Sequence, residues 1–398
     1  MKKQLLIFAW EYDGYHSISG AALSRRIRQV AEDFEKNGWQ AIVIHRDQRG
    51  ECGHTPFVIK TEPSGVQRIV VRSVKNVSDY SRFTLLRKLR TFYYVAFHGD
   101  RSYKWANNVI KYFDKFGITR PDLIISFFTP RGPLFLGHHF GAKLHTPWIA
   151  DLQDNFDHGI SQVLIPENKR WTKKILTTAQ AVVHVSTEWA ETDGKLLELN
   201  IKTIRHAVPN ATTKTDTVQH PDKPFTIFYG GSLSEQDQSL YVLKKAINDI
   251  DTFPRPVELL IAGTTPTFES FARVLGDAIT VKNLGWLNKQ DYNAQLAACD
   301  CSLVIPWSTP PRQVVPSKFY ELCGYGKPIW IVGNDTGGFA YLLEEWKHPA
   351  IATTNIGFQQ KALLAAINGN FSLMFNMQNC AQNYIKEDDL FKKYTELI

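Results

Sequence analysis

The sequence predicts an α/β protein built from two doubly wound, Rossmann-like domains. Short apolar runs alternate with stretches of helical periodicity along nearly the whole chain, which is typical of parallel strands covered by helices. The alternation stops once, over Arg205–Pro224, where three prolines and four threonines replace the apolar pattern. We interpret this stretch as a linker, so the 398 residues divide into two domains of similar size.

The first domain is expected over residues 1–208 and opens with a βαβ unit. The apolar run Gln4–Trp10 forms a strand, and the polar loop Glu11–Gly20 leads into a helix that Gly38 ends. A second, parallel strand follows at Gln40–His45. Three more apolar runs suit buried parallel strands: Asp122–Phe127, Thr146–Ala150 and Ala181–Val185.

The linker is expected over 209–224 and the second domain over 225–373. Five apolar runs are expected to be its strands: Phe225–Gly230, Val257–Gly263, Ile279–Gly285, Cys301–Pro306 and Pro328–Gly333. Helical periodicity falls between them near 237–249, 267–276, 289–298 and 316–325. The last stretch, 374–398, is amphipathic and predicts one long helix. Ligands of doubly wound sheets bind at the carboxyl ends of the strands.

Composition excludes several classes of protein. With 43% hydrophobic and 21% charged residues, the chain has the balance of a globular protein, and it contains no apolar run of 18 or more residues. Its first residues lack the long apolar stretch and the small-residue cleavage site of a signal peptide. The five cysteines are odd in number and too sparse for a disulfide or zinc framework. We therefore expect a reducing, cytoplasmic location, and not a disordered, fibrous, disulfide-rich secreted or integral membrane protein.

The net charge of +7 is divided unevenly along the chain. Residues 1–210 hold 30 Lys and Arg against 20 Asp and Glu, whereas residues 211–398 hold 16 against 19. This asymmetry indicates a basic first domain with an anionic partner: nucleic acid, a membrane surface or a phosphorylated substrate. No nucleic-acid-binding motif accompanies the basic residues, so we expect no nucleic acid partner.

The segment 82–120 concentrates this charge, with nine Lys and Arg and two acids among many aromatic and leucine side chains. Such a composition is typical of an interfacial segment, whose apolar side enters the headgroup region while its charges meet anionic lipid. It predicts peripheral binding at the inner face of the cell membrane. The alternative is that the aromatics pack in the domain's own core and the cations form a solvated face.

A distinctive stretch runs from Ile305 to Ile329. A strand ends in a proline-rich loop, Ser317 is expected to cap a short helix, and Gly326 stops it. Glu321 is the one acidic side chain within that otherwise apolar helix. A carboxylate there can accept two hydrogen bonds from a ribose diol, while the helix N-terminus faces phosphate. The alternative is that Glu321 is an exposed helix residue without a ligand.

The pattern Pro316-Ser317-Lys318-Phe319-Tyr320-Glu321-Leu322, followed by Gly326-Lys327-Pro328-Ile329, resembles the donor-nucleotide helix of GT-B glycosyltransferases of the retaining, GT4-like group. Further resemblances lie at Ser19–Ala21, Val208–Asn210, Phe228–Ser234, Leu259–Gly263, Val281–Leu287 and Asn334–Gly338. The resemblance implies two Rossmann-like domains that face a central cleft and a C-terminal helix that crosses back to the first domain. It implies transfer of a sugar from a nucleotide-sugar donor, with a UDP-sugar favoured. The acceptor would be a hydroxyl of a glycan or lipid-linked molecule, with retention, in cell-surface polysaccharide or glycoconjugate synthesis.

The resemblance also assigns donor-site residues. Glu321 would hold the ribose hydroxyls, and Gly20 would offer its backbone to the diphosphate. Trp286 and Leu287 would border the base. The other donor-site residues that it implies are Gly231, Ser232, Gly263 and Ser317. The family needs no metal and no cofactor, because basic side chains and helix N-termini balance the phosphate charge.

Three features depart from the family's pattern. Its diphosphate-neutralising Arg–Lys pair is replaced by Ser232 and Asp237, and the first acid of its Glu-x7-Glu pair is Gln313. The histidine often found after a mid-sheet strand of the first domain is absent from Ile125–Phe128. These losses raise an alternative function, a catalytically weak GT-B-like scaffold subunit that binds a glycan or a protein.

Two cations can replace the missing Arg–Lys pair. Arg312 and Lys318 flank the loop above the short helix, and we expect them to carry the diphosphate charge. The alternative is a pair of solvated surface cations, which for Arg312 stays open.

The candidates for acceptor chemistry lie in the first domain. Asp151, Asp154 and Asp157 follow the apolar strand that ends at Ala150. Asp154 or Asp151 is expected to orient or deprotonate an acceptor hydroxyl, and a loop that caps the next helix is the alternative. His16, on the first loop, is a candidate for contact with acceptor or donor, unless it is only a solvated loop histidine.

Overall fold

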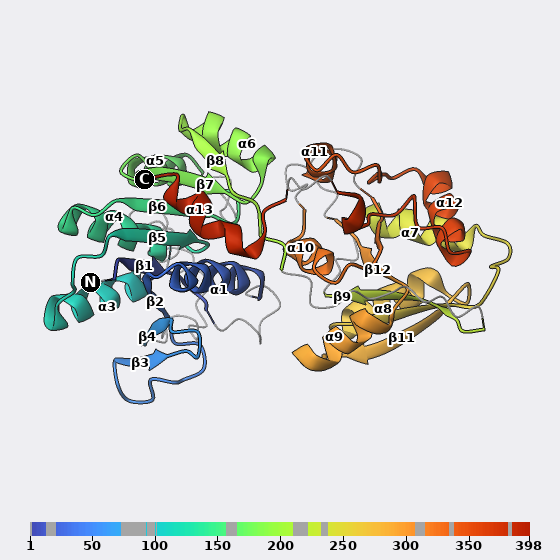
Figure 1. Cartoon of the computed structure of the whole chain (residues 1–398), viewed down its shortest axis with the longest axis horizontal. Coiled ribbons are helices and arrows are strands. Elements are labelled where there is room, and N and C mark those ends of the chain that lie inside the picture. Colours follow the sequence, from blue (N-terminus) through green and yellow to red (C-terminus); the bar gives the residue numbers. More distant parts are fainter. Residues whose placement is uncertain are drawn as a thin grey trace. The chain divides into compact units, whose positions relative to one another are not determined.

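A computed structural model gives the fold of the chain (Figure 1). The structure describes residues 2–12, 21–72, 93, 100, 102–156, 165–209, 222–231, 238–306, 315–333, 338–380 and 384–398. The chain divides into two compact units. Unit 1 comprises Met1–Ala207 and Glu387–Ile398, and unit 2 comprises Val208–Lys386. Most of the linker expected over 209–224 lies outside the described residues.

Unit 1 is built on a sheet of eight strands in the order β3-β4-β2-β1-β5-β6-β7-β8. The strands are β1 (Gln4–Phe8), β2 (Gln40–Arg46), β3 (Phe57–Thr61), β4 (Gln67–Val71), β5 (Leu123–Phe128), β6 (Trp148–Leu152), β7 (Ala181–His184) and β8 (Ile201–Thr203). The described helices are α1 (Ala21–Lys36), α3 (Tyr103–Phe116), α4 (Gly132–Leu144), α5 (Ile165–Leu176), α6 (Thr187–Leu197) and α13 (Leu390–Thr395). All pairings are parallel except that of β3 with β4. The strand order reverses beside β1, as in a doubly wound sheet.

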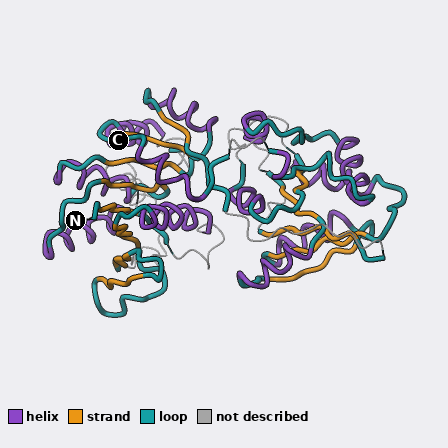
Figure 2. Tube along the Cα trace, viewed as in Figure 1, coloured by secondary structure: helices purple, strands orange, loops and turns teal. Residues whose placement is uncertain are grey.

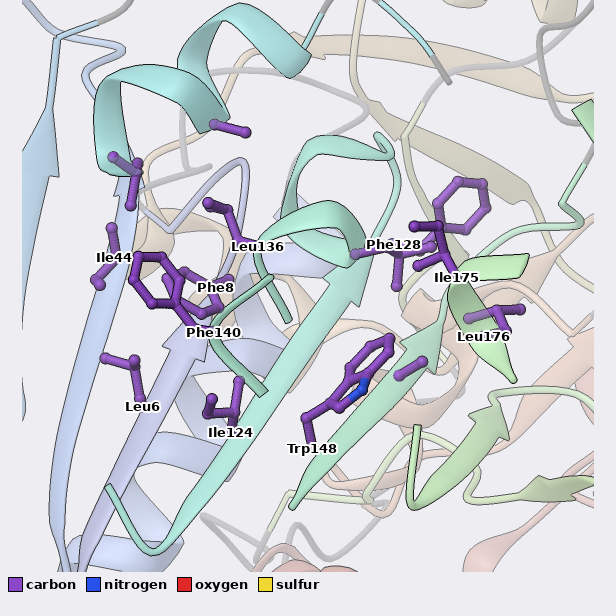
Figure 3. Packing of buried hydrophobic residues seen from close by; sticks show 14 of the residues in the cluster. Leu6, Phe8, Ile44, Ile124, Phe128, Leu136, Phe140, Trp148, Ile175 and Leu176 are labelled. Carbon is purple, nitrogen blue, oxygen red and sulfur yellow. The ribbon is translucent and has the colours of Figure 1, made fainter. Parts of the chain in front are cut away.

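The core of unit 1 explains why its central strands are continuous apolar runs. All six residues of β5 are buried, because helices pack on both faces of a doubly wound sheet. The rings of Phe8 and Phe140 stack with their centroids 5.5 Å apart (Figure 3). On α4, a Cβ at Gly137 would lie 2.6 Å from the Trp148 ring, so only glycine lets this helix approach β6 so closely.

Unit 2 is built on a five-stranded, wholly parallel sheet in the order β11-β10-β9-β12-β13. Its strands are β9 (Phe225–Gly230), β10 (Val257–Ala262), β11 (Thr280–Gly285), β12 (Cys301–Val304) and β13 (Ile329–Ile331). Its described helices are α7 (Gln238–Asn248), α8 (Thr265–Leu275), α9 (Lys289–Ala298), α10 (Ser317–Cys323), α11 (Gly338–Glu345) and α12 (Ile356–Ile367). Strands and helices alternate along the chain (Figure 2), and all five strand predictions fall on observed strands.

The fold class is confirmed: both units are doubly wound α/β structures, and the C-terminal helix α13 belongs to unit 1. The prediction of one helix over 374–398 is wrong. Phe375 instead exchanges two backbone hydrogen bonds with Ile329, at 2.7 and 2.9 Å, which makes its backbone an extension of the unit 2 sheet. Among the described residues of this stretch, the α-helix covers only Leu390–Thr395. Within the described part of the chain, no helix has the length and apolar character needed to cross a membrane.

Candidate active site

The carboxyl ends of the unit 2 strands meet at one edge of the sheet, where doubly wound folds bind their ligands. The strand order reverses between β9 and β12, which makes the end of β9 the topological switch point. Gly231 directly follows β9, Gly263 follows β10, and Trp286 follows β11. Three residues of the predicted donor site therefore lie at the ends of three neighbouring strands.

The glycines at this edge allow two backbone segments to approach each other closely. Gly231 has a φ of +142° and donates its N–H to the carbonyl of Ala262 over 2.8 Å. A Cβ at Gly263 would lie 2.2 Å from the carbonyl oxygen of Gly231, so a side chain at that position would displace the loop. Bare backbone of this kind is what a phosphate-binding edge of a doubly wound sheet requires.

Lys318 places a cation at the switch point. Its Nζ donates to the carbonyl oxygen of Gly230 and lies 5.5 Å from the centroid of the Tyr229 ring. A Cβ at Gly231 would lie only 1.6 Å from this nitrogen, so the ammonium fills the space directly above that glycine. The structure thus brings the Lys318 cation and the glycine backbone together, and the diphosphate role of Lys318 stays a prediction.

Glu321 lies three residues beyond Lys318 on α10, so both project from the same side of the helix. The opposite side, formed by Phe319, Tyr320 and Leu322, is buried in the unit 2 core. Glu321 itself is half-buried. The prediction that Ser317 caps this helix is wrong: Ser317 is its first helical residue. Pro316 takes the cap position, with no side-chain hydrogen bond to the described helix.

Trp286 and Leu287 differ in exposure. The Trp286 side chain is 64% exposed, although it belongs to a large aromatic residue that usually packs inside. Leu287 is half-buried and packs against the core cluster that contains α10. An exposed aromatic face at this edge is available for stacking on a planar base.

Several predicted site residues lie outside the described residues. They are His16, Gly20, Asp157, Ser232, Asp237, Arg312 and Gln313. Their roles remain predictions.

In unit 1 the two aspartates proposed for acceptor chemistry, Asp151 and Asp154, have different surroundings. Asp154 is half-buried, and its Oδ2 accepts a hydrogen bond from the Thr129 hydroxyl over 2.8 Å. Thr129 follows β5 and Asp154 follows β6, so both lie at the carboxyl edge of the sheet.

Asp151 is fully buried and is occupied by a network that the sequence prediction missed. Arg26 on α1 donates to its Oδ2 from Nε and Nη2, at 3.1 and 2.9 Å, and Tyr394 on α13 donates its hydroxyl to the same atom. The third nitrogen of Arg26 donates to the carbonyl of Arg205 over 2.8 Å. This arrangement favours a structural task for Asp151 and leaves Asp154 as the candidate base. Arg26 lies on the apolar face of its helix, between Leu23 and Ile27, which was a sequence signal of a buried, paired cation.

Among the described residues, no three His, Cys, Asp or Glu side chains gather as a metal centre would require. Independence from metal and cofactor stays a prediction.

Comparisons with solved structures identify the fold. The crystal structure of HepE of Anabaena in complex with UDP and glucose is similar over 99% of this chain and 98% of that one, with a TM-score of 0.60 and 15% identity. WaaB, a lipopolysaccharide outer core galactosyltransferase, is similar over 99% and 98%, with a TM-score of 0.57 and 14% identity. A putative UDP-N-acetylglucosamine 2-epimerase from Listeria monocytogenes is similar over 99% and 95%, with a TM-score of 0.54 and 12% identity. No protein-family profile and no curated protein matches the sequence. The chain therefore has the GT-B fold, two Rossmann-like units joined in one chain.

Proposed function

We propose that this protein is a glycosyltransferase that moves a sugar from a nucleotide-sugar donor to a hydroxyl of a glycan or lipid-linked acceptor. The observation that carries the proposal is the Lys318 ammonium above Gly230 and Gly231 at the switch point of unit 2. A cation there meets the diphosphate of a nucleotide bound at the strand ends. Glu321 lies on the same side of α10 as Lys318. In this proposal its carboxylate accepts hydrogen bonds from the ribose hydroxyls.

In the proposed reaction the bond between the sugar and the diphosphate breaks, and the acceptor hydroxyl forms the new bond to the sugar. Negative charge develops on the leaving diphosphate, and Lys318 stabilises it. Asp154 accepts the proton of the acceptor hydroxyl or orients that hydroxyl for attack. Retention and membership of the GT4-like group rest on the sequence resemblance.

A UDP-sugar is the favoured donor, because a structure of the same fold, HepE, binds UDP and glucose. A task in cell-surface polysaccharide or glycoconjugate synthesis, in the cytoplasm or at the inner face of the membrane, agrees with the basic composition of residues 1–210. The support for the UDP-sugar donor and for the task in polysaccharide synthesis is the sequence and the likeness in fold.

Incubation with a panel of UDP-, GDP- and ADP-sugars, each with and without a membrane extract as acceptor source, tests the function. We expect release of the nucleoside diphosphate from one donor class, with the sugar transferred to an extract component. Lys318→Ala should reduce release strongly, and Lys289→Ala, which removes an exposed lysine from the start of α9, should not. A protein that binds nucleotide sugars but releases nothing would be the scaffold. Conversion of the sugar to its epimer on the intact nucleotide would also contradict the proposal.

A further inference from the structure

Trp10 and Arg46 lie side by side at the carboxyl edge of the unit 1 sheet. In the register of β1 and β2, Phe8 pairs with Ile44, so two residues further on Trp10 lies opposite Arg46 on the same face. The backbone N–H of Arg46 donates to the carbonyl of Trp10 over 3.4 Å. The guanidinium carbon lies 4.3 Å from the centroid of the Trp10 ring, in a cation–π contact. We call these two residues and Glu11 the Trp10–Arg46 patch.

Among the described residues, the guanidinium of this patch has few close hydrogen-bond partners. Its ion pair within the described part of the chain is a loose one, in which Nη2 lies 3.6 Å from Oε1 of Glu11. Its Nε is shielded from solvent and has no hydrogen-bond partner among the described residues. The neighbouring carboxylate of Asp47 is turned to other donors, the backbone N–H groups of Glu51 and Cys52 at 2.9 and 3.0 Å.

Burial of this kind is costly for a cation. Desolvation lowers the pKa of Arg46 in spite of the nearby Glu11 and Asp47 carboxylates. A bound anion would supply the missing hydrogen bonds and offset the desolvation. Trp10 itself packs edge-on against Trp105, with the ring centroids 5.6 Å apart, so the guanidinium lies beside an aromatic ring that is held by a second one.

The position of the patch and the shape of its guanidinium indicate which ligand groups it can bind. It follows β1, beside which the strand order of unit 1 reverses, so it lies at the ligand-binding edge of that sheet. The planar fork of an arginine matches a carboxylate or a phosphate. Residues 1–210, which include the patch, hold the excess of basic residues in the chain.

We propose that Arg46, supported by Trp10, binds a carboxylate or phosphate group carried by the saccharide acceptor. The inference rests on the proposed function, because it names the chemical class of the acceptor. It makes the acceptor an acidic sugar, such as a uronic acid, or a sugar phosphate, and assigns Arg46 to specificity.

Binding of three probes by NMR titration tests the proposal: methyl glucuronide, glucose 6-phosphate and the neutral methyl glucoside. Wild-type protein should bind at least one acidic probe about tenfold or more tightly than the neutral one, as for a hydrogen bond to a charged group. Arg46→Gln should abolish that preference, while Arg49→Gln, which removes the same charge from an exposed turn three residues away, should keep it. Arg46→Lys should lose part of the preference, because it keeps the charge without the planar fork.

Two results would overturn the proposal: equal binding of all three probes by the wild type, or an undiminished preference in folded Arg46→Gln. If Arg46→Gln does not fold, Arg46→Lys decides, and an undiminished preference there also counts against the planar fork. UDP titration of the same proteins separates this inference from the proposed function. If none of them binds UDP, the donor assignment fails, whereas the preference for acidic probes is judged by the Arg46 variants alone.

Discussion

Glu321 and Lys318 share one side of a seven-residue helix whose other side is buried. The sequence indicated both residues correctly as members of one helix, because one acid and one cation interrupt an apolar pattern there. The sequence could not indicate that the lysine fills the space above Gly231, since that closeness depends on a glycine 87 positions earlier in the chain. Local periodicity places a residue on a face, and only tertiary packing places it beside a distant backbone.

The ribose assignment predicts discrimination between UDP and 2′-deoxy-UDP. A hydrogen bond between a carboxylate and the ribose diol contributes about 1.5–3 kcal/mol, so wild-type protein should prefer UDP by about ten- to a hundredfold. Glu321→Gln should reduce that preference, and Glu344→Gln, which changes an exposed acid on α11, should leave it intact. Isothermal titration measures both affinities. Full discrimination in Glu321→Gln would remove this residue from the ribose site.

His184 predicts a pH dependence of stability. Burial lowers its pKa from 6.5 to about 3, so the folded protein keeps the ring neutral where the unfolded chain protonates it. The unfolded state then binds more protons, and the free energy of unfolding falls by about 1.4 kcal/mol per pH unit on this account as the pH drops below 6.5.

Urea unfolding at a series of pH values between 6 and 4 measures the effect. The slope of stability against pH should be shallower in His184→Gln than in wild type, and unchanged in His54→Gln, where the histidine is exposed. The slope of the free energy of unfolding against pH is compared, and not its absolute value, because His184→Gln changes a buried residue and lowers stability at every pH. An unaltered slope in His184→Gln would show that the ring is not held neutral.

At the scale of elements, continuous apolar runs identified the strands that are buried on both faces, such as β5 and β9. The strands β3 and β4 went unpredicted, although they form an antiparallel hairpin at one edge of the unit 1 sheet. β3 has no buried residue, with two half-buried positions followed by three exposed ones, and it is only five residues long, so its pattern resembles a loop. The three-residue β8 is too short for any period to show.

The docking of α13 onto unit 1 depends on side chains that the sequence pattern could not connect. Tyr394 bonds to both members of the buried Arg26–Asp151 pair. The carboxylate of Asp33 on α1 accepts the backbone N–H of Phe391 over 2.6 Å, near the N-terminus of α13. The ring of Phe391 packs against Phe34 with the centroids 4.9 Å apart.

Tyr394→Phe tests this docking. The variant keeps the ring but removes the hydroxyl, which leaves part of a buried charged pair without its hydrogen bond and costs about 1–3 kcal/mol. The free energy of unfolding in urea should fall by that amount, and Tyr341→Phe, at an exposed tyrosine of α11, should change little. Equal stability of Tyr394→Phe and wild type would mean that the hydroxyl does not hold the helix.

At the scale of the whole molecule, the basic character of residues 1–210 remains the main evidence for a membrane partner. In the first half of the segment 82–120, from Arg82 to Arg101, the structure describes only Tyr93 and Asp100. Of its described aromatics, Trp105 is 1% exposed and belongs to the core of unit 1, whereas Phe116 is 55% exposed. The segment thus contributes to both alternatives, because one aromatic packs inside and another faces solvent.

Sedimentation with liposomes tests the membrane proposal. Binding should appear with anionic vesicles, be absent with neutral ones and fall steeply as salt rises, since each basic side chain near such a surface contributes about 1 kcal/mol. Replacing Arg87, Lys88 and Arg90 by Ser should weaken it. The control replaces Lys244, Lys289 and Lys361, three exposed lysines of unit 2, by Ser and keeps the same net charge change. Equal recovery with both kinds of vesicle would leave the basic segment 82–120 without a lipid partner.

Hydrogen–deuterium exchange with and without UDP tests the donor site in unit 2, because it shows where in the chain a nucleotide binds. We expect slower exchange in the peptides that contain the end of β9 with Gly231, the residues after β11 with Trp286, and α10 with Lys318 and Glu321. Lys318→Ala should reduce this protection at the same UDP concentration. Protection confined to unit 1, or none at UDP concentrations up to the millimolar range, would contradict the assignment of the donor site.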